Sequence, residues 1–174
     1  ESQPVAKFNG YAFELGRKLG LSKYDINKTS RVTRITVDKQ FDGLIATASK
    51  GGGAISGNVL CALDTSASMT WTTLDNAGTQ PYDVCLSLGI YFSELNKGAF
   101  HNVVAEFSST SKLMTLSGSF SDKWNQLQRS CYGGGSTNFQ SLIDLLVNTR
   151  KNNPSMPLED FPQTLLVVSD MEFN

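Results

Sequence analysis

The sequence predicts an α/β fold, a three-layer sandwich in which helices cover a mainly parallel sheet with one antiparallel strand. Two continuous apolar runs of strand length, residues 58–64 and 164–169, are typical of parallel strands buried on both faces. Segments with helical periodicity separate the strand-like runs, and this alternation indicates a parallel sheet between helical layers. The hydroxyl run 108–111 between two strand-like segments predicts a hairpin, which supplies the antiparallel strand.

The N-terminal part of the chain has the weaker pattern, and we expect residues 1–57 to form an extension and linker. Apolar residues in Tyr11–Leu21 have helical gaps, but two glycines weaken that pattern. A helical stripe predicts a helix from Val37 to Ala48. The glycines of residues 49–58 are typical of a flexible joint.

Residues 58–174 form the main domain, in which strands and helices alternate. Pro81 suits the first turn of a helix, and one stripe of that helix is apolar. The following short helix is expected to begin at a cap, Ser121 or Asp122, and the last helix at Ser136 or Thr137. We expect, in order, a strand at 58–64, a helix at about 82–97, strands at 102–107 and 112–116, a short helix at 119–130, a helix at about 138–150 with Phe139, Leu142, Ile143, Leu145 and Leu146 inward, and a strand at 164–169.

Composition and charge exclude several classes of protein. A hydrophobic fraction of 40% is typical of a globular chain, and a net charge of -1 argues against a large electrostatic footprint for nucleic acid or anionic lipid. No apolar run approaches the roughly 18 residues of a spanning helix, and the N-terminus lacks a signal pattern. Cys61 and Cys85 fall in apolar patterns, which favours reduced core residues. We therefore expect a cytoplasmic protein without membrane contact.

Oxygen-bearing side chains gather where the two apolar strands end. Asp64 and Asp170 terminate these strands, and Ser66 and Ser68 follow the first. Thr137 lies at a glycine-rich entry to a helix. In open α/β sheets, ligands bind beyond the carboxyl ends of the strands, so neighbouring strands would bring these five residues together.

This donor set favours a hard divalent cation. All its donors are oxygens, which suit Mg²⁺ first, with Mn²⁺ or Ca²⁺ as alternatives. Zinc would require histidine or cysteine, and the single histidine, His101, lies before a strand at the opposite end. Glu172 and Asn138 are candidates for supporting the ligands or contacting a partner. The alternative interpretation is that Ser66 or Ser68 only caps a helix.

The segment Asp64-Thr65-Ser66-Ala67-Ser68 resembles the D-x-S-x-S loop of von Willebrand factor A (vWA) domains. In those domains a distant threonine and aspartate complete a metal-ion-dependent adhesion site (MIDAS), and Thr137 and Asp170 have the matching order and contexts. The segments TNFQ, SDMEF and DKQFDGLI look like an uncharacterised intracellular vWA family of giant viruses, phages, bacteria and plants. The vWA half of Ro (TROVE) ribonucleoproteins is more distantly similar.

The resemblance implies a vWA, Rossmann-like fold and a metal ion with one open coordination position. A partner's Asp or Glu fills that position in the family, so the implied function is a non-enzymatic, metal-dependent protein-binding module. Family domains continue past the strand at 164–169 with further helix and strand elements, and we expect residues 58–174 to lack them.

Other functions are open at this point. An RNA- or ribonucleoprotein-associated vWA protein and a structural virion component are the alternatives, the latter with a virion location. An aspartyl-phosphate phosphatase would need a second acidic residue where Ser66 stands, and a lysine in the loop. No phosphate-binding G-x-x-x-x-G-K-[ST] loop occurs in the sequence. We therefore expect no enzyme.

Overall fold

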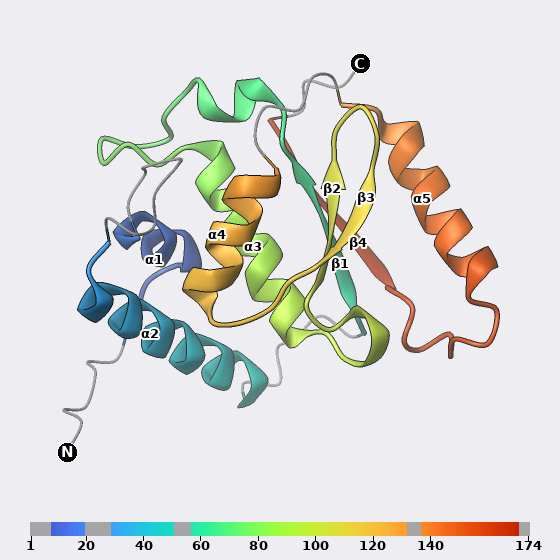
Figure 1. The fold of residues 1–174 in the computed structure, drawn as a ribbon, viewed down its shortest axis with the longest axis horizontal. Coiled ribbons are helices and arrows are strands. Elements are labelled where there is room, and N and C mark those ends of the chain that lie inside the picture. The colour runs from blue at the N-terminus through green and yellow to red at the C-terminus, as the bar shows by residue number, and fades with distance from the viewer. Residues whose placement is uncertain (1–7, 20–28, 51–56, 132–136, 171–174) are drawn as a thin grey trace.

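A computed structural model describes residues 8–19, 29–50, 57–131 and 137–170 (Figure 1). Its four-stranded sheet has the order β3-β2-β1-β4. The strands are β1 (Val59–Asp64), β2 (Val103–Phe107), β3 (Lys112–Thr115) and β4 (Thr164–Val168). β1 pairs in parallel with both β2 and β4, and β3 pairs antiparallel with β2. This topology confirms the predicted α/β fold with a mainly parallel sheet and one antiparallel strand.

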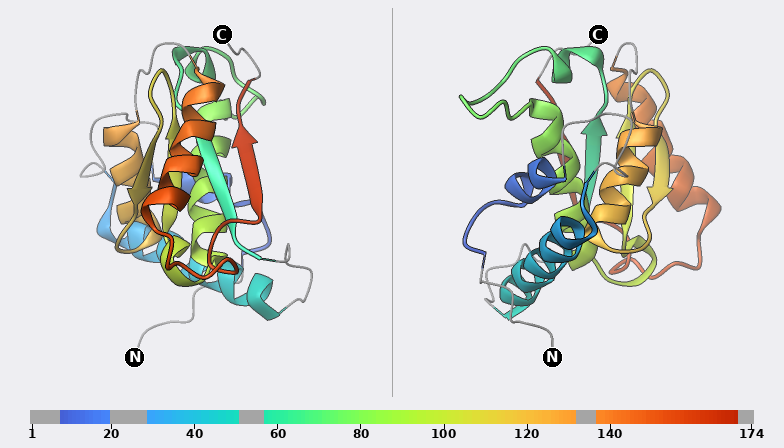
Figure 2. Two further views of the ribbon diagram at one scale, coloured as in Figure 1. Left: turned by 90° about the vertical axis from the view of Figure 1, so that its right-hand side faces the viewer. Right: turned by 60° about the vertical axis from the view of Figure 1, so that its left-hand side comes forward.

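The side chains of β1 alternate between two apolar cores, one on each face of the sheet. Val59, Cys61 and Leu63 belong to the larger core, together with residues of the N-terminal and central helices. Leu60 and Ala62 belong to the smaller core, which α5 (Phe139–Asn152) covers. Figure 1 shows the strands between α5 and the other helices, and in the left-hand view of Figure 2 α5 lies in front of the strands. Burial on both faces explains the continuous apolar run of this strand.

The helix α3 (Pro81–Leu95) is buried on more sides than the predicted single stripe. It packs between β1, α1 (Ala12–Lys18) and α4 (Phe120–Ser130), so Leu86 and Ile90 are fully buried as well. The predicted end of α3, about residue 97, is two residues too late. Asn96 leaves the helical conformation because its side chain bonds the backbone N–H and C=O of Val59, each at 2.8 Å.

Two helix starts differ from the prediction. Ser119 caps α4, in place of Ser121 or Asp122, and the Asp122 carboxylate accepts from the Ser119 backbone in a capping box. Ser121 instead donates to Asp38 of α2 (Arg31–Lys50). Asn138 caps α5, so the expectation of Thr137 is wrong, and Ser136 lies outside the described residues.

Of the residues predicted to lie inward on α5, Leu142 is fully buried and Ile143, Leu145 and Leu146 are half-buried. Phe139 does not follow the prediction: it is 43% exposed, with one ring edge against Phe107. It is the first residue of the helix, where its ring contacts the last residue of β2.

The N-terminal helices pack into the larger core. The helix predicted from Val37 to Ala48 is α2, which begins at Arg31 and ends at Lys50. Leu15 of α1 and Phe41 of α2 are buried against the helices of the main domain. Gly16 allows this contact, because a Cβ there would lie 2.3 Å from the Trp124 ring. No helix in the described part of the chain has the length and apolar character needed to cross a membrane.

Candidate metal site at the carboxyl end of the sheet

The parallel strands β1, β2 and β4 end at the same side of the molecule, called here the carboxyl end of the sheet. Asp64 ends β1 and pairs in register with Phe107 at the end of β2. On the other side of β1, Leu63 pairs with Val168, so the chain continues from β4 directly into Ser169 and Asp170 beside Asp64. The topology therefore brings the two predicted strand-terminal aspartates to neighbouring positions.

Asp64 is fully buried, and each of its carboxylate oxygens accepts a hydrogen bond from a neutral donor. Oδ1 accepts from the Ser66 backbone N–H at 2.9 Å, and Oδ2 accepts from the Ser169 hydroxyl at 2.5 Å. The first bond is a local turn within the loop, and the second joins β1 to β4 across the sheet. Together they fix the direction of the carboxylate.

Ser66 and Ser68 present their hydroxyls to each other. Their Oγ atoms lie 3.0 Å apart, because the short 3₁₀ helix η2 (Ala67–Thr70) turns the chain back on itself. Ser66 occupies the N-cap position of η2, but its side chain makes no cap hydrogen bond. This geometry argues against the alternative that Ser66 serves as a helix cap.

Thr137 is buried, and the backbone beside it is joined to the end of β2. The Asn138 N–H donates to the Ser108 carbonyl at 3.0 Å, one residue past the strand that pairs with β1. The Asn138 side chain caps α5 by accepting from the Ser141 N–H at 3.2 Å. Thr137 and Asp64 are thus at the same end of the sheet, as the metal-site prediction requires.

Asp170 follows β4 at the same end and is half-buried. Glu172, the other acidic candidate, lies outside the described residues. The predicted donor set omits Ser169, although its hydroxyl donates to the Asp64 carboxylate at 2.5 Å. The available signal was its position between an apolar strand and Asp170.

Two acidic side chains at the carboxyl end of the sheet, Glu106 and Asp64, differ in whether a cationic side chain lies beside them. Glu106, near the end of β2, has a counter-ion, because the Lys112 ammonium lies 2.7 Å from its Oε2. Within the described ranges, no lysine, arginine or histidine nitrogen lies within 4.0 Å of the Asp64 carboxylate. Asp64 is therefore a buried carboxylate with two hydrogen bonds from neutral donors and without a cationic neighbour in the part of the chain that the structure describes.

The donor set differs from sites built on several acidic or imidazole groups. No group of three or more His, Cys, Asp or Glu residues that could hold a metal occurs among the residues with described positions. The predicted set has two carboxylates, Asp64 and Asp170, and its other members are hydroxyls. His101 lies before β2, at the opposite end of the sheet, with its ring Nδ1 3.1 Å from the Asn96 carbonyl oxygen.

Comparison with known proteins gives a family without an assigned activity. Residues 58–174 match the family described as "Domain of unknown function (DUF7788)". The chain belongs to this family. It is also 31% identical over 138 residues to "Uncharacterized protein L728" of Acanthamoeba polyphaga mimivirus, a match over 79% of this chain and 22% of that protein. The chain thus spans about a fifth of the length of this curated relative. No solved structure matches the chain.

Proposed function

We propose that this DUF7788 chain is a non-enzymatic protein-binding module of the vWA type that depends on a divalent cation. Asp64, Ser66, Ser68, Thr137 and Asp170 would hold the cation at the carboxyl end of the sheet. An Asp or Glu side chain of a protein partner would complete the coordination.

The observation that carries this proposal is the buried Asp64 carboxylate without a cationic neighbour among the described residues. Taking a carboxylate out of water costs several kcal/mol unless an opposite charge or strong hydrogen bonds compensate it. Its two neutral donors, Ser66 N–H and Ser169 O–H, compensate only part of that cost. A cation beside Asp64 would supply the missing charge, as Lys112 does for Glu106.

The chemistry of the donors favours Mg²⁺ and the related hard ions Mn²⁺ and Ca²⁺. Carboxylate and hydroxyl oxygens suit these ions, and water completes their coordination. The Ser66 and Ser68 oxygens, 3.0 Å apart, are close enough together to serve one ion. The two negative charges of Asp64 and Asp170 do no more than neutralise the two positive charges of the cation. The bound cation would therefore still attract an anionic oxygen from a partner.

Binding fits this site better than catalysis. The only histidine of the sequence lies at the opposite end of the sheet, where it cannot exchange protons with these hydroxyls. The three cysteines are buried free thiols, which fits a reducing compartment such as the cytoplasm.

Calorimetric titration with Mn²⁺ and Mg²⁺ tests the proposal. The unaltered chain should bind one ion, and Asp64→Asn should abolish binding, since an amide cannot replace the anionic ligand. Asp122→Asn is the matched control: it removes one carboxylate from the capping box of α4, far from this site, and should bind as the unaltered chain does. Equal affinity in Asp64→Asn and the unaltered chain would reject the site.

A further inference from the structure

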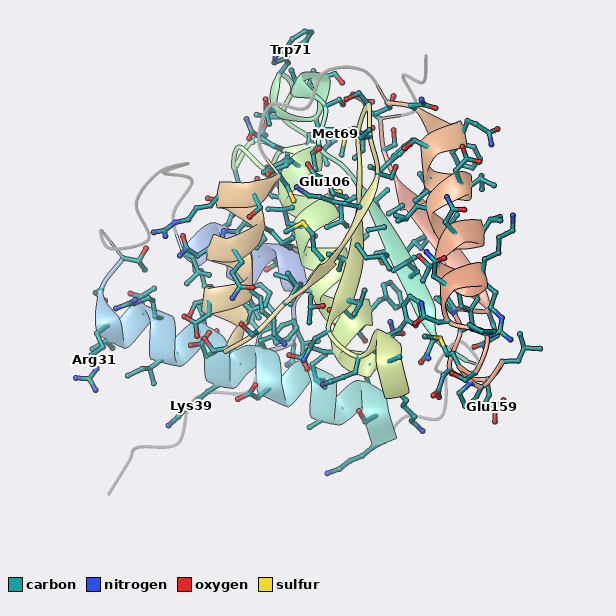
Figure 3. The ribbon with its side chains drawn as sticks, turned by 45° about the vertical axis from the view of Figure 1, so that its right-hand side comes forward. Arg31, Lys39, Met69, Trp71, Glu106 and Glu159 are labelled. Atoms are coloured by element: carbon teal, nitrogen blue, oxygen red, sulfur yellow. The ribbon has the colours of Figure 1, made fainter. Side chains whose placement is uncertain are left out.

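The ten residues 71–80, called here the rim loop, connect η2 to α3 directly after the proposed metal loop. Two large apolar side chains of this loop are in solvent: Trp71 is 77% exposed and Leu74 is 60% exposed. Figure 3 shows Trp71 extending away from the ribbon at the end of the molecule where β1 ends. The other tryptophan, Trp124, is buried in the larger core.

The rim loop is held in one conformation by hydrogen bonds around Asp75. The Asp75 carboxylate accepts from the backbone N–H groups of Ala77 and Thr79, at 3.0 and 2.9 Å, and from the Thr79 hydroxyl at 2.7 Å. The Leu74 N–H donates to the Thr79 carbonyl at 2.7 Å, which closes the loop. Leu74 is therefore presented to solvent by a fixed backbone.

The loop is also fixed relative to the proposed metal ligands. The Trp71 N–H donates to the Ser68 carbonyl at 3.0 Å, so the tryptophan follows directly from a ligand-bearing turn. The Gln80 side chain donates to the Thr70 carbonyl at 2.7 Å, and Arg17 of α1 donates to Thr79 at 2.7 Å and to Asp75 at 3.3 Å. These bonds join the loop to η2 and to α1.

Exposed apolar side chains on an ordered loop are typical of a binding surface. Tryptophan is enriched among residues that dominate binding energy, and such residues act in packed pockets from which water is excluded. A loop that is already ordered loses little entropy on binding. A partner that covered Trp71 and Leu74 would remove two large apolar side chains of one loop from water.

We infer that Trp71 and Leu74 form an apolar subsite beside the proposed metal site. Its occupant is a protein segment that carries an apolar side chain next to the Asp or Glu that completes the coordination. This inference rests on the proposed function. A protein segment fits better than a nucleic acid, because Arg17, the one cationic side chain bonded to the rim loop among the described residues, is paired with Asp75, and the chain has a net charge of -1.

A display library of random 12-residue peptides tests the inference with the whole 174-residue chain as bait in Mg²⁺. Peptides are eluted with a chelator and sequenced. We expect enrichment of Asp or Glu with an aromatic or aliphatic neighbour. An enriched peptide should bind the Trp71→Ala and Leu74→Ser variants about tenfold more weakly or worse, as for a residue that dominates binding. Leu158→Ser is the matched control, since Leu158 is 70% exposed in the segment that leads into the start of β4, at the opposite end.

The outcomes separate the two proposals. If the chelator elutes no enriched acidic peptide, the proposed function is wrong, and this inference fails with it. If acidic peptides are enriched without apolar neighbours, or bind all variants equally, the metal site stands and the apolar subsite is overturned. Acrylamide quenching of Trp71 fluorescence at rising protein concentration supplies the last check. Protection without peptide would mean that a second copy of the chain covers Trp71, which also overturns the inference.

Discussion

Asp64→Asn should separate two effects of the Asp64 charge: the stability that its burial costs and the metal binding that it allows. The substitution keeps the shape of the side chain and both hydrogen bonds. The amide oxygen can still accept from the Ser66 N–H, and the Ser169 hydroxyl can turn to accept from the new amide nitrogen. What changes is the buried negative charge, which has no cationic neighbour in the described ranges.

Without metal, we expect the variant to be more stable than the unaltered chain. Losing charge assistance in two hydrogen bonds costs about 1 kcal/mol each, while burying an uncompensated carboxylate costs several kcal/mol. The free energy of unfolding should therefore rise by about 1–3 kcal/mol in Asp64→Asn. Urea unfolding in the presence of a chelator measures this difference.

With Mg²⁺ the order should reverse. An ion present at about 100 times its dissociation constant stabilises the folded state by about 2.7 kcal/mol. For a chain of this size that free energy raises Tm by about 5–10 °C in the unaltered chain and in the Asp122→Asn control. Asp64→Asn should show no such shift. The reasoning is refuted if Asp64→Asn is less stable than the unaltered chain without metal, or if Mg²⁺ raises the Tm of Asp64→Asn as much as that of the unaltered chain.

Thr137→Ala should weaken metal binding in calorimetry. Asn138→Ala should instead keep metal affinity and cost about 1 kcal/mol of stability, because Asn138 caps α5. Hydrogen bonds from the Thr79 hydroxyl and backbone N–H lower the pKa of Asp75. The stabilisation of the rim loop by the ionised carboxylate is therefore fully present above about pH 4 and is lost as pH falls through the lowered pKa. Acrylamide quenching of the exposed tryptophan should change only in that acidic range, and a change near neutral pH would contradict this assignment. Burial raises the pKa of the Cys61 thiol to about 12 and raises that of Cys85 as well, so a thiol reagent at pH 8 should modify neither in the folded chain and both after unfolding. Rapid labelling of the folded chain would show that these thiols are accessible.

Local patterns predicted the elements of the main domain well. The runs at 58–64 and 164–169 are β1 and β4, because strands buried on both faces need apolar residues at every position. Periodicity also predicted α3 and α5 within two residues at each end. It did not predict the caps, because Ser121 bonds Asp38, which is 83 residues away in the sequence, and Ser119 is therefore the cap of α4.

The N-terminal helices were predicted less well because their pattern depends on contacts with distant residues. Gly16 reads as a helix breaker in isolation, yet it lets α1 approach the Trp124 ring. The apolar residues of α2 that are buried, Val37 and Phe41, lie only in its middle. Both ends of α2 are mostly polar and exposed, so the sequence stripe indicated its centre and missed its start.

For the candidate site, the sequence by itself determined the oxygen donors: Asp64, Ser66 and Ser68 are close in the chain, and their spacing is a local property. Only the tertiary structure decided which distant groups join them. Ser169 reaches the Asp64 carboxylate because β4 pairs with β1, and this register depends on burial of both faces of β1. Among the described residues, the lack of a cation beside the Asp64 carboxylate is likewise a property of the packed fold, because it depends on which distant side chains the tertiary structure brings to that carboxylate.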